Sequence, residues 1–257
     1  AVYDTRRGRT WRPLIDTTND PVIARRAPLS WRSWQRSEDY YSEGQLIWLD
    51  ADTLIRQLSG GKHSLDDVAR HFFGTNDGSF ITSTYEFDDV VKALNDIQPY
   101  DWATFLRKRL DETSEHAPLD GFTRGGYRLV YTDQPNKYVG SFASVRHVED
   151  FAFSLGLTIG KGGALGNVEW GSPAWRAGIT RDAKVIAVNG EAYDPEVLRE
   201  AIVDAKDAHA APIALLLQEG DRYVTVSVPY HGGLRYPHLE RVEGKPDMLA
   251  AILAPRH

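Results

Sequence analysis

The hydrophobic pattern changes its period once along the 257 residues, close to Pro118. Before that point apolar residues recur at the spacing of amphipathic helices, and after it they alternate at the two-residue spacing of strands. This switch predicts an α+β fold in which helices and strands are segregated. We therefore expect a helical subdomain over 1–117, a small β-rich domain over 118–232 and a C-terminal tail over 233–257.

The helical part begins its regular pattern at Glu38, and a wide apolar stripe predicts one helix from there to Leu58. After a glycine break, Ser64 and Asp67 fit the N-cap and N3 positions of a capping box. Further helices are expected in "TSTYEFDDVVKALNDI" and in "PYDWATFLRKRLDETS". Asp50 and Asp52 are expected to lie on a solvated face of the long helix.

The first 36 residues differ from the rest because they carry prolines and have no clean period. We expect an extended segment that lies over another surface. Trp31 and Trp34 in this segment, and the residues around Tyr41, are expected to be exposed. Tryptophan side chains bury a large apolar area, so such exposure predicts an apolar patch or association with a partner.

Short strands are expected after Pro118 in "YRLVYT", "KYVGSF", "LGLTI" and "GNVEW", with "DQPN" as a turn between the first two. Ser172, Pro173 and Gly178 predict a single capped helical turn in "GSPAWRAGI". The later signals are, in chain order, a tight turn at Asn189–Gly190, a helix start at Asp194–Pro195 that leads through Leu198, Ala201 and Ile202, and a hairpin at Gly220–Asp221.

Composition excludes several function classes. The net charge is −6 and no basic block is present, so nucleic acid is not an expected partner. No apolar run approaches the roughly 20 residues that span a bilayer. Cysteine is absent, which excludes disulfides, thiolate metal sites and cysteine nucleophiles. The first residues lack both an initiator methionine and the apolar core of a signal peptide, so the chain is expected to be a fragment or a processed product.

The run "GSPAWRAGITRDAKVIAVNGEAY" resembles the signature of bacterial PDZ domains, although Arg181–Asp182 stands where that signature has Gly-Asp. The resemblance implies a loop whose amides bind a peptide carboxylate and a strand whose edge pairs with the peptide. It assigns these roles to Leu155, Gly156, Leu157, Thr158 and Ile159, with Leu198, Ala201 and Ile202 lining the side-chain pocket. The groove is either open to a peptide or filled by the protein's own chain.

The stretch "YYSEGQLIWLDADTLIRQLSGGKHSLDDVARHFF" resembles the end of the thermolysin-like catalytic domain in glycyl aminopeptidase-type zinc metallopeptidases. Later segments, "ALNDIQPYDWATFLRKRL" and "GGLRYPHLERVEGKPDMLAAILAPR", resemble the same family. The resemblance implies that Tyr41, three residues before Gly44, stabilises the developing oxyanion, with Tyr40 as the competitor for that role. A phenol stays protonated at neutral pH and can donate such a hydrogen bond. Glu43 replaces the more usual lysine.

The zinc-binding motif of that family is absent, because none of the eight histidines begins an HExxH sequence. The pairs His63/His71 and His231/His238 are more consistent with packing or surface positions than with a metal site. The resemblance places the zinc motif before the tyrosine helix, so zinc is expected in a missing N-terminal half and no metal or other cofactor in this chain.

Two functions remain open. In the first, the chain is the C-terminal part of a zinc-dependent aminopeptidase, is inactive alone, and has a peptide substrate and the missing N-terminal half as partners. In the second, it is a non-catalytic module that binds peptide C-termini. The resemblance suggests an exported or periplasmic protein, and a cytoplasmic one remains an alternative.

Overall fold

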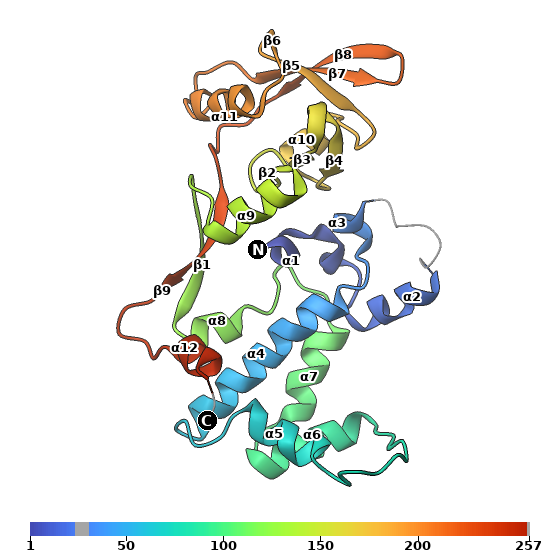
Figure 1. Ribbon diagram of the computed structural model, residues 1–257, viewed down its shortest axis with the longest axis vertical. Helices are drawn as coiled ribbons and strands as arrows, with labels where there is room; N and C mark the ends of the chain where they lie inside the picture. The colour runs from blue at the N-terminus through green and yellow to red at the C-terminus, as the bar shows by residue number, and fades with distance from the viewer. Residues whose placement is uncertain (24–30, 256–257) are drawn as a thin grey trace. The chain divides into compact units, whose positions relative to one another are not determined.

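The computed structural model describes residues 1–23 and 31–255, which form two compact units (Figure 1). We call the first the helical unit; it contains residues 2–23, 35–128 and 240–255. The second, the β unit, contains Ala1 and residues 31–34 and 129–239. A helical part and a part with small sheets confirm the predicted α+β class. The domain boundaries expected at 117/118 and 232/233 stay predictions.

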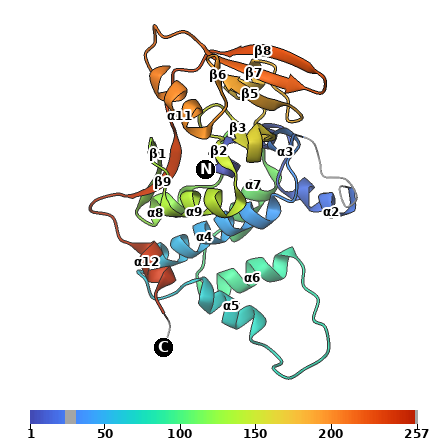
Figure 2. The ribbon, with the colours of Figure 1, turned by 45° about the horizontal axis from the view of Figure 1, so that its top comes forward.

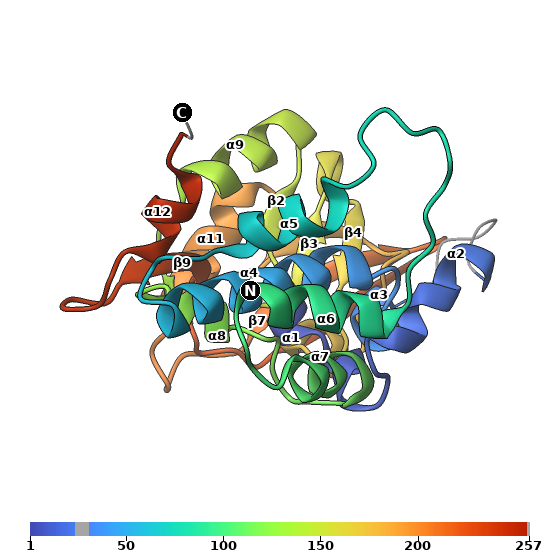
Figure 3. The same cartoon turned by 90° about the horizontal axis from the view of Figure 1, so that it is seen from below.

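The helical unit is built on the long helix α4 (Tyr40–Leu58), close to the predicted range. Its other helices are α1 (Val2–Thr5), η1 (Arg7–Thr10), η2 (Ile15–Asn19), α2 (Asp20–Ile23), α5 (Leu65–Phe73), α6 (Phe87–Ile97), α7 (Trp102–Asp111), α8 (Asp120–Arg124) and α12 (Met248–Leu253). Helices α5 and α6 lie side by side (Figure 2), and Figure 3 shows the long loop that joins them.

An apolar core holds α4 to the helices that follow it. Ile47, Ala51 and Ile55 of α4 belong to the same buried cluster as Leu94 of α6 and Trp102 of α7. Trp102 is fully buried, and its indole Nε1 donates a 2.7 Å hydrogen bond to the carbonyl of Gln98, so the polar end of the ring is satisfied. The helical stripe read from the sequence is therefore the face that α4 buries.

The predicted capping box is confirmed at the start of α5. The Ser64 amide donates to Asp67 Oδ2 at 2.8 Å, and the Ser64 side chain accepts from the N3 backbone. Burying this helix start without those bonds would leave backbone donors unpaired. Asp52 adds a further acceptor, because its Oδ1 receives the Leu65 amide at 2.7 Å. Side chains thus fix the turn from α4 to α5.

The expectation of an extended segment over residues 1–36 is wrong for the described residues, which form short helices, among them α3 (Arg32–Gln35). Arginine–carboxylate pairs between distant residues hold these turns, and a hydrophobic period cannot reveal such pairs. Residues 24–30 lie outside the described part of the chain.

Trp31 and Trp34 are half-buried rather than exposed, because both pack on Trp170 of the β unit. The ring centroids of Trp34 and Trp170 are 5.0 Å apart in a stacked arrangement, and Trp31 meets Trp170 edge-on at 5.5 Å. Ser33 Oγ accepts the Trp170 amide at 2.9 Å. The two tryptophans therefore pack residues 31–34 within the β unit, to which these residues belong.

The β unit has two sheets of its own, with strand orders β2-β3-β4 and β6-β5-β7-β8. The strands are β2 (Glu149–Phe151), β3 (Leu157–Ile159), β4 (Leu165–Val168), β5 (Lys184–Val188), β6 (Glu191–Ala192), β7 (Ile213–Glu219) and β8 (Arg222–Val228); the helices are α9 (Lys137–Arg146), η3 (Lys161–Gly163), α10 (Pro173–Arg176) and α11 (Pro195–Asp204). The chain leaves the helical unit in β1 (Tyr127–Thr132) and returns in β9 (Tyr236–Arg241), and these two strands pair.

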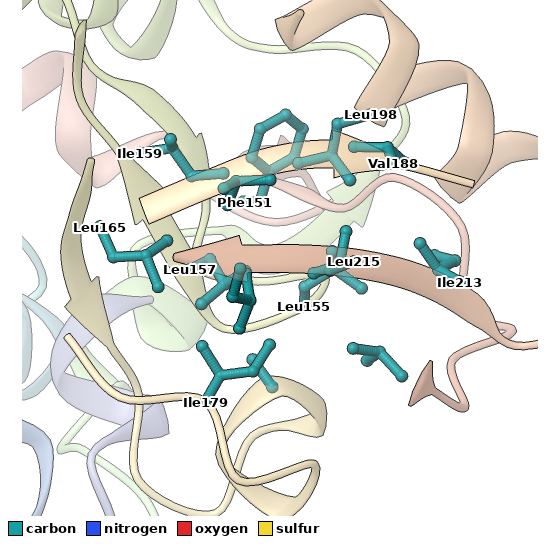
Figure 4. Packing of buried hydrophobic residues seen from close by; sticks show 14 of the residues in the cluster. Phe151, Leu155, Leu157, Ile159, Leu165, Ile179, Val188, Leu198, Ile213 and Leu215 are labelled. Carbon is teal, nitrogen blue, oxygen red and sulfur yellow. The ribbon is translucent and has the colours of Figure 1, made fainter. Parts of the chain in front are cut away.

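One core joins both of these sheets to α11, as Figure 4 shows. Its labelled members are Phe151, Leu155, Leu157, Ile159, Leu165, Ile179, Val188, Leu198, Ile213 and Leu215. The β7–β8 hairpin turns at Gly220, as predicted, and extends as a long ribbon in Figure 2.

The turn chemistry read from the β-rich sequence is confirmed. Ser172 Oγ accepts the Trp175 amide at 3.1 Å to cap α10. Asn189 and Gly190 have φ of 51° and 90°, the left-handed values that a tight hairpin turn requires. Asp194 Oδ1 accepts the Glu196 amide at 2.9 Å at the start of α11.

The strand expected in "KYVGSF" is wrong, because these residues belong to helix α9. Asn136 Oδ1 accepts the Val139 amide at 2.9 Å and caps the helix, while its Nδ2 donates to the Pro237 carbonyl at 2.8 Å. β1 pairs instead with β9, about a hundred residues away. Tertiary pairing outweighs the alternating pattern here.

We expect Ser64→Ala to lower the free energy of unfolding of the helical unit by about 1 kcal/mol, because the substitution removes the N-cap acceptor of α5. Urea denaturation followed by circular dichroism measures the change. Ser83→Ala, at an exposed position outside any helix, serves as the matched control and should be neutral. Equal stability of both variants would show that the capping box contributes nothing.

Candidate functional site

Two adjacent tyrosines occupy the first turn of α4. Tyr41 is 66% exposed, whereas Tyr40 packs partly against the helical core. Their ring centroids are 4.5 Å apart with 32° between the planes. The pKa of Tyr40 is raised to about 12, mainly by a side-chain hydrogen bond with Tyr41 and to a lesser extent by burial. The phenol of Tyr41 is thus presented to the outside on a rigid helix, with Tyr40 as its neighbour.

Gly44 leaves the surface beside Tyr41 bare. It lies three residues on, which on a helix is the same face, and a Cβ atom placed there would meet nothing within 4 Å. The space next to the Tyr41 ring is consequently not filled by a side chain from α4 itself.

Glu43, also in this first turn, points into the protein and is 2% exposed. Arg9 donates to it with both terminal nitrogens, at 2.8 and 3.3 Å, and Arg36 Nη2 lies 2.7 Å from Glu43 Oε1. A lysine at this position would place a third cation here, whereas the glutamate fits the two arginines that meet it.

Asp39 continues the same buried network one turn earlier. It is fully buried, accepts from Arg36 Nε at 3.0 Å, and pairs with Arg6. Arg12 pairs with Asp20 at 2.7 Å and donates to Asp16 at 2.6 Å, and the latter hydrogen bond lowers the pKa of Asp16. The start of α4 is therefore held by charge-assisted bonds from several directions.

The middle of α4 repeats this arrangement. Asp50 is fully buried and pairs with Arg109 of α7, whose Nε donates at 2.8 Å, and with Arg124 of α8. Asp52 is also buried and accepts from Arg56 Nε at 2.6 Å. The prediction that Asp50 and Asp52 lie on a solvated face is wrong, because both are buried. Asp50 pairs with arginines of α7 and α8, and Asp52 pairs with Arg56 of α4 itself.

Glu43→Ala is expected to lower the free energy of unfolding by about 3–5 kcal/mol, since it leaves two buried guanidinium groups without their shared carboxylate. Chemical denaturation measures the effect. Glu38→Ala, with an exposed side chain two positions before Tyr40, is the control and should change stability little. A loss for Glu43→Ala no larger than for the control would contradict the structural role of the network.

The residues assigned to peptide binding lie mostly in the core of the β unit. Leu155, Leu157, Ile159, Leu198 and Ile202 have no exposed surface, Ala201 is 7% exposed, and Thr158 is half-buried. Gly156 has φ of +85°, and a Cβ there would collide with the side chain of Ser172. The sequence signature thus marks a tightly packed loop. Whether it binds a peptide stays a prediction.

The edges of β3 are both paired, one with β2 and the other with β4. The amides of Ser154 and Gly156 in the preceding loop donate to the Phe151 carbonyl at 3.1 and 2.9 Å. The β unit's own chain therefore occupies the strand edge and two of the loop donors that a peptide would use. The outer strand of this sheet is β2.

A cavity of about 790 Å³ lies beside β2 and is also lined by α9 and α11. Its carboxylates are Asp133, Glu149, Asp150, Glu196, Glu200 and Asp204. Arg199 pairs with Glu149 and, at 3.0 Å, with Glu196. Burial raises the pKa of Asp150, whose Oδ1 accepts the Ala152 amide. The cavity thus has acidic walls and a strand edge along one side.

Among residues 1–23 and 31–255, no three histidine, aspartate or glutamate side chains are grouped as a metal site requires. Three of the four histidines in the pairs singled out in the sequence have other partners. His71 contacts Asp96 at 3.1 Å, His231 contacts the Ala205 carbonyl, and His238 contacts the Gln134 carbonyl. The same part of the chain contains no helix that is long and apolar enough to cross a membrane.

No family model and no curated protein matches the chain. A crystal structure of an aminopeptidase N family protein from Idiomarina loihiensis is similar over 99% of this chain, with a TM-score of 0.61 and 18% identity. The chain spans 43% of that protein's length. This likeness shows the fold alone.

A crystal structure of the HtrA3 PDZ domain bound to a phage-derived ligand (FGRWV) aligns with 46% of this chain and 95% of its own, at 18% identity. Its TM-score is 0.23, too low to carry an argument about the β unit.

Sequence reasoning found the exposed tyrosine but missed the charge network beneath it. A signal was present, because Asp39, Glu43 and Asp50 recur at spacings of four and seven, which places them on one face of a helix. The first 36 residues are also rich in arginine. An acidic stripe on a helix next to an arginine-rich segment favours buried ion pairs over a solvated face.

Proposed function

We propose that this chain is the C-terminal part of a zinc-dependent aminopeptidase of the glycyl aminopeptidase type, in which Tyr41 stabilises the transition state. The observation that carries the proposal is the exposed Tyr41 on the first turn of a helix anchored by buried ion pairs. The fold likeness to an aminopeptidase N family protein over nearly the whole chain supports it.

The chemistry assigned to Tyr41 is hydrogen-bond donation. Peptide hydrolysis develops negative charge on the carbonyl oxygen, and a donor held in position before the reaction stabilises that charge without reorganisation. The pairs formed by Glu43 and Asp39 restrict movement of the turn that carries the phenol. The bare surface at Gly44 leaves space for a substrate beside the ring.

The described residues do not fit a zinc site, so the proposal assigns the metal to an N-terminal half that this chain lacks. That half is the partner the chain requires, a peptide is the substrate, and this chain alone is inactive. By analogy with the family, we propose an exported or periplasmic location.

Tyr41→Phe in the product of the full upstream reading frame is expected to lower kcat about 10²–10³-fold, because it removes one oxyanion donor, and to change KM little. Aminopeptidase assays together with zinc analysis measure this, and the 257-residue chain should show neither activity nor bound zinc. Tyr40→Phe tests whether its phenol, which is hydrogen-bonded to Tyr41, competes for the role. Tyr223→Phe, at an exposed tyrosine of the β unit, is the control and should leave kcat unchanged.

Equal activity of Tyr41→Phe and the parent protein would remove Tyr41 from the mechanism. Absence of both zinc and activity in the longer product would overturn the aminopeptidase proposal itself.

A second candidate function, a peptide-binding module, is favoured by the acidic cavity beside the edge strand β2. Strand addition at a sheet edge supplies backbone hydrogen bonds, and neighbouring side chains select the sequence. Of the six cavity carboxylates, Glu149 and Glu196 are paired with Arg199. The remaining negative charge favours a peptide with lysine or arginine side chains.

A fluorescent extended peptide that alternates lysine with valine is expected to bind the 257-residue chain more tightly than its glutamate counterpart in fluorescence anisotropy. Asp204→Asn, which removes a cavity carboxylate, should weaken binding by about two- to fivefold, as for a partly solvated charge pair. The control Asp182→Asn, exposed and outside the cavity, should leave it unchanged. Equal binding of both peptides would eliminate this candidate.

A further inference from the structure

A second cavity, of about 450 Å³, lies within the helical unit. It is bounded by η1, α4, α7 and α8 and by the segment that connects α7 to α8. Tyr41 is not among its lining residues, whereas Glu43 and Leu54 of α4 are. The cavity is therefore distinct from the tyrosine surface, and its chemistry does not depend on the aminopeptidase proposal.

Four arginines line this cavity, and they share two carboxylates. Arg9 and Arg36 both pair with Glu43. Arg109 and Arg124 both pair with Asp50, which is itself fully buried. Because two guanidinium groups share one carboxylate, positive charge is in excess both at Glu43 and at Asp50.

The neighbouring charges reduce this excess only in part. Asp39 is shared between Arg36 and Arg6, so three guanidinium groups meet two buried carboxylates at the start of α4. Asp120 lies 3.5 Å from Arg109, but its side chain is 68% exposed and is therefore screened by water. Asp20 does not reduce the excess, because it forms an ion pair with Arg12.

One of the four arginines has an unsatisfied donor. Arg9 is 5% exposed, and its Nε has no hydrogen-bond partner among the described residues although both terminal nitrogens bind Glu43. A buried N–H without an acceptor is costly, and a charged one more so. The contacts of the Arg9 guanidinium group therefore compensate its charge only in part.

Lys108 of α7 supplies a further cation at the cavity wall. The acidic side chains of the wall, Asp101 and Glu112, belong to exposed residues in contact with water. Asp101 already accepts the Thr104 amide at 3.1 Å as the cap of α7, and His116 lies 3.3 Å from Asp4. Buried guanidinium groups therefore outnumber the buried carboxylates around the cavity, and the other acidic side chains lie at its exposed margin.

We propose that this cavity binds a small oxyanion, a phosphate or a short dicarboxylate, between the guanidinium groups that line it and Lys108 at its wall. Oxyanions suit the site because guanidinium and ammonium groups form charge-assisted hydrogen bonds with them. The bound anion neutralises the excess positive charge next to Glu43 and stabilises the packing of α7 against α4.

Isothermal titration calorimetry of the 257-residue chain with inorganic phosphate and with succinate, against chloride at equal ionic strength, tests the proposal. Saturable binding of one probe is expected, and the preferred probe distinguishes a tetrahedral oxyanion from a carboxylate. Lys108→Gln should weaken binding about tenfold. Arg107→Gln removes a cation from the same helix at a position outside the cavity, and should not weaken it.

Arg9→Lys provides a second test, because it keeps the positive charge and removes the planar guanidinium group. If this variant folds, the rise in Tm that the bound anion causes in the parent chain by mass action should shrink or vanish. If it does not fold, the comparison of Lys108→Gln with Arg107→Gln still decides. Absence of saturable binding of either probe, or equal weakening by the two α7 variants, would overturn the proposal.

Discussion

The pairing of buried carboxylates on α4 with arginines from other segments is the interaction on which the helical unit depends. Asp39, Glu43 and Asp50 are removed from water and each meets two guanidinium groups. A carboxylate buried without such partners would be strongly destabilising. The pairs therefore oblige η1, α7 and α8 to lie where their arginines reach α4, and the apolar stripe adds the remaining packing.

The same network links stability to the proposed site. Glu43 and Tyr41 belong to one helical turn but point to different surroundings, the first to the arginines and the second to solvent. A phenol on a turn fixed in this way is held before any substrate arrives, which is the condition for effective transition-state stabilisation. Sharing each carboxylate between two arginines also leaves positive charge on the other side of α4.

Packing in the β unit accounts for residues to which the resemblance assigns peptide binding. Gly156 of the predicted loop adopts a left-handed conformation against Ser172 of the signature, and that serine caps α10. The aliphatic residues beside them fill the core, and β2 pairs with the strand edge that a peptide would use. The sequence did not reveal the cavity next to β2. Helix α9 lines this cavity, but the residues of α9 alternate in the pattern of a strand, so no helix was predicted there.

The sequence by itself determined the α+β class, the range of α4, the capping box at Ser64 and the turn at Asn189–Gly190, because each depends on local periodicity or on contacts within a few residues. It also singled out Tyr41 through a resemblance. Tertiary structure decided that β1 pairs with β9, that α9 is a helix, and that Asp50 is buried. Those outcomes depend on partners up to a hundred residues away, which local patterns do not encode.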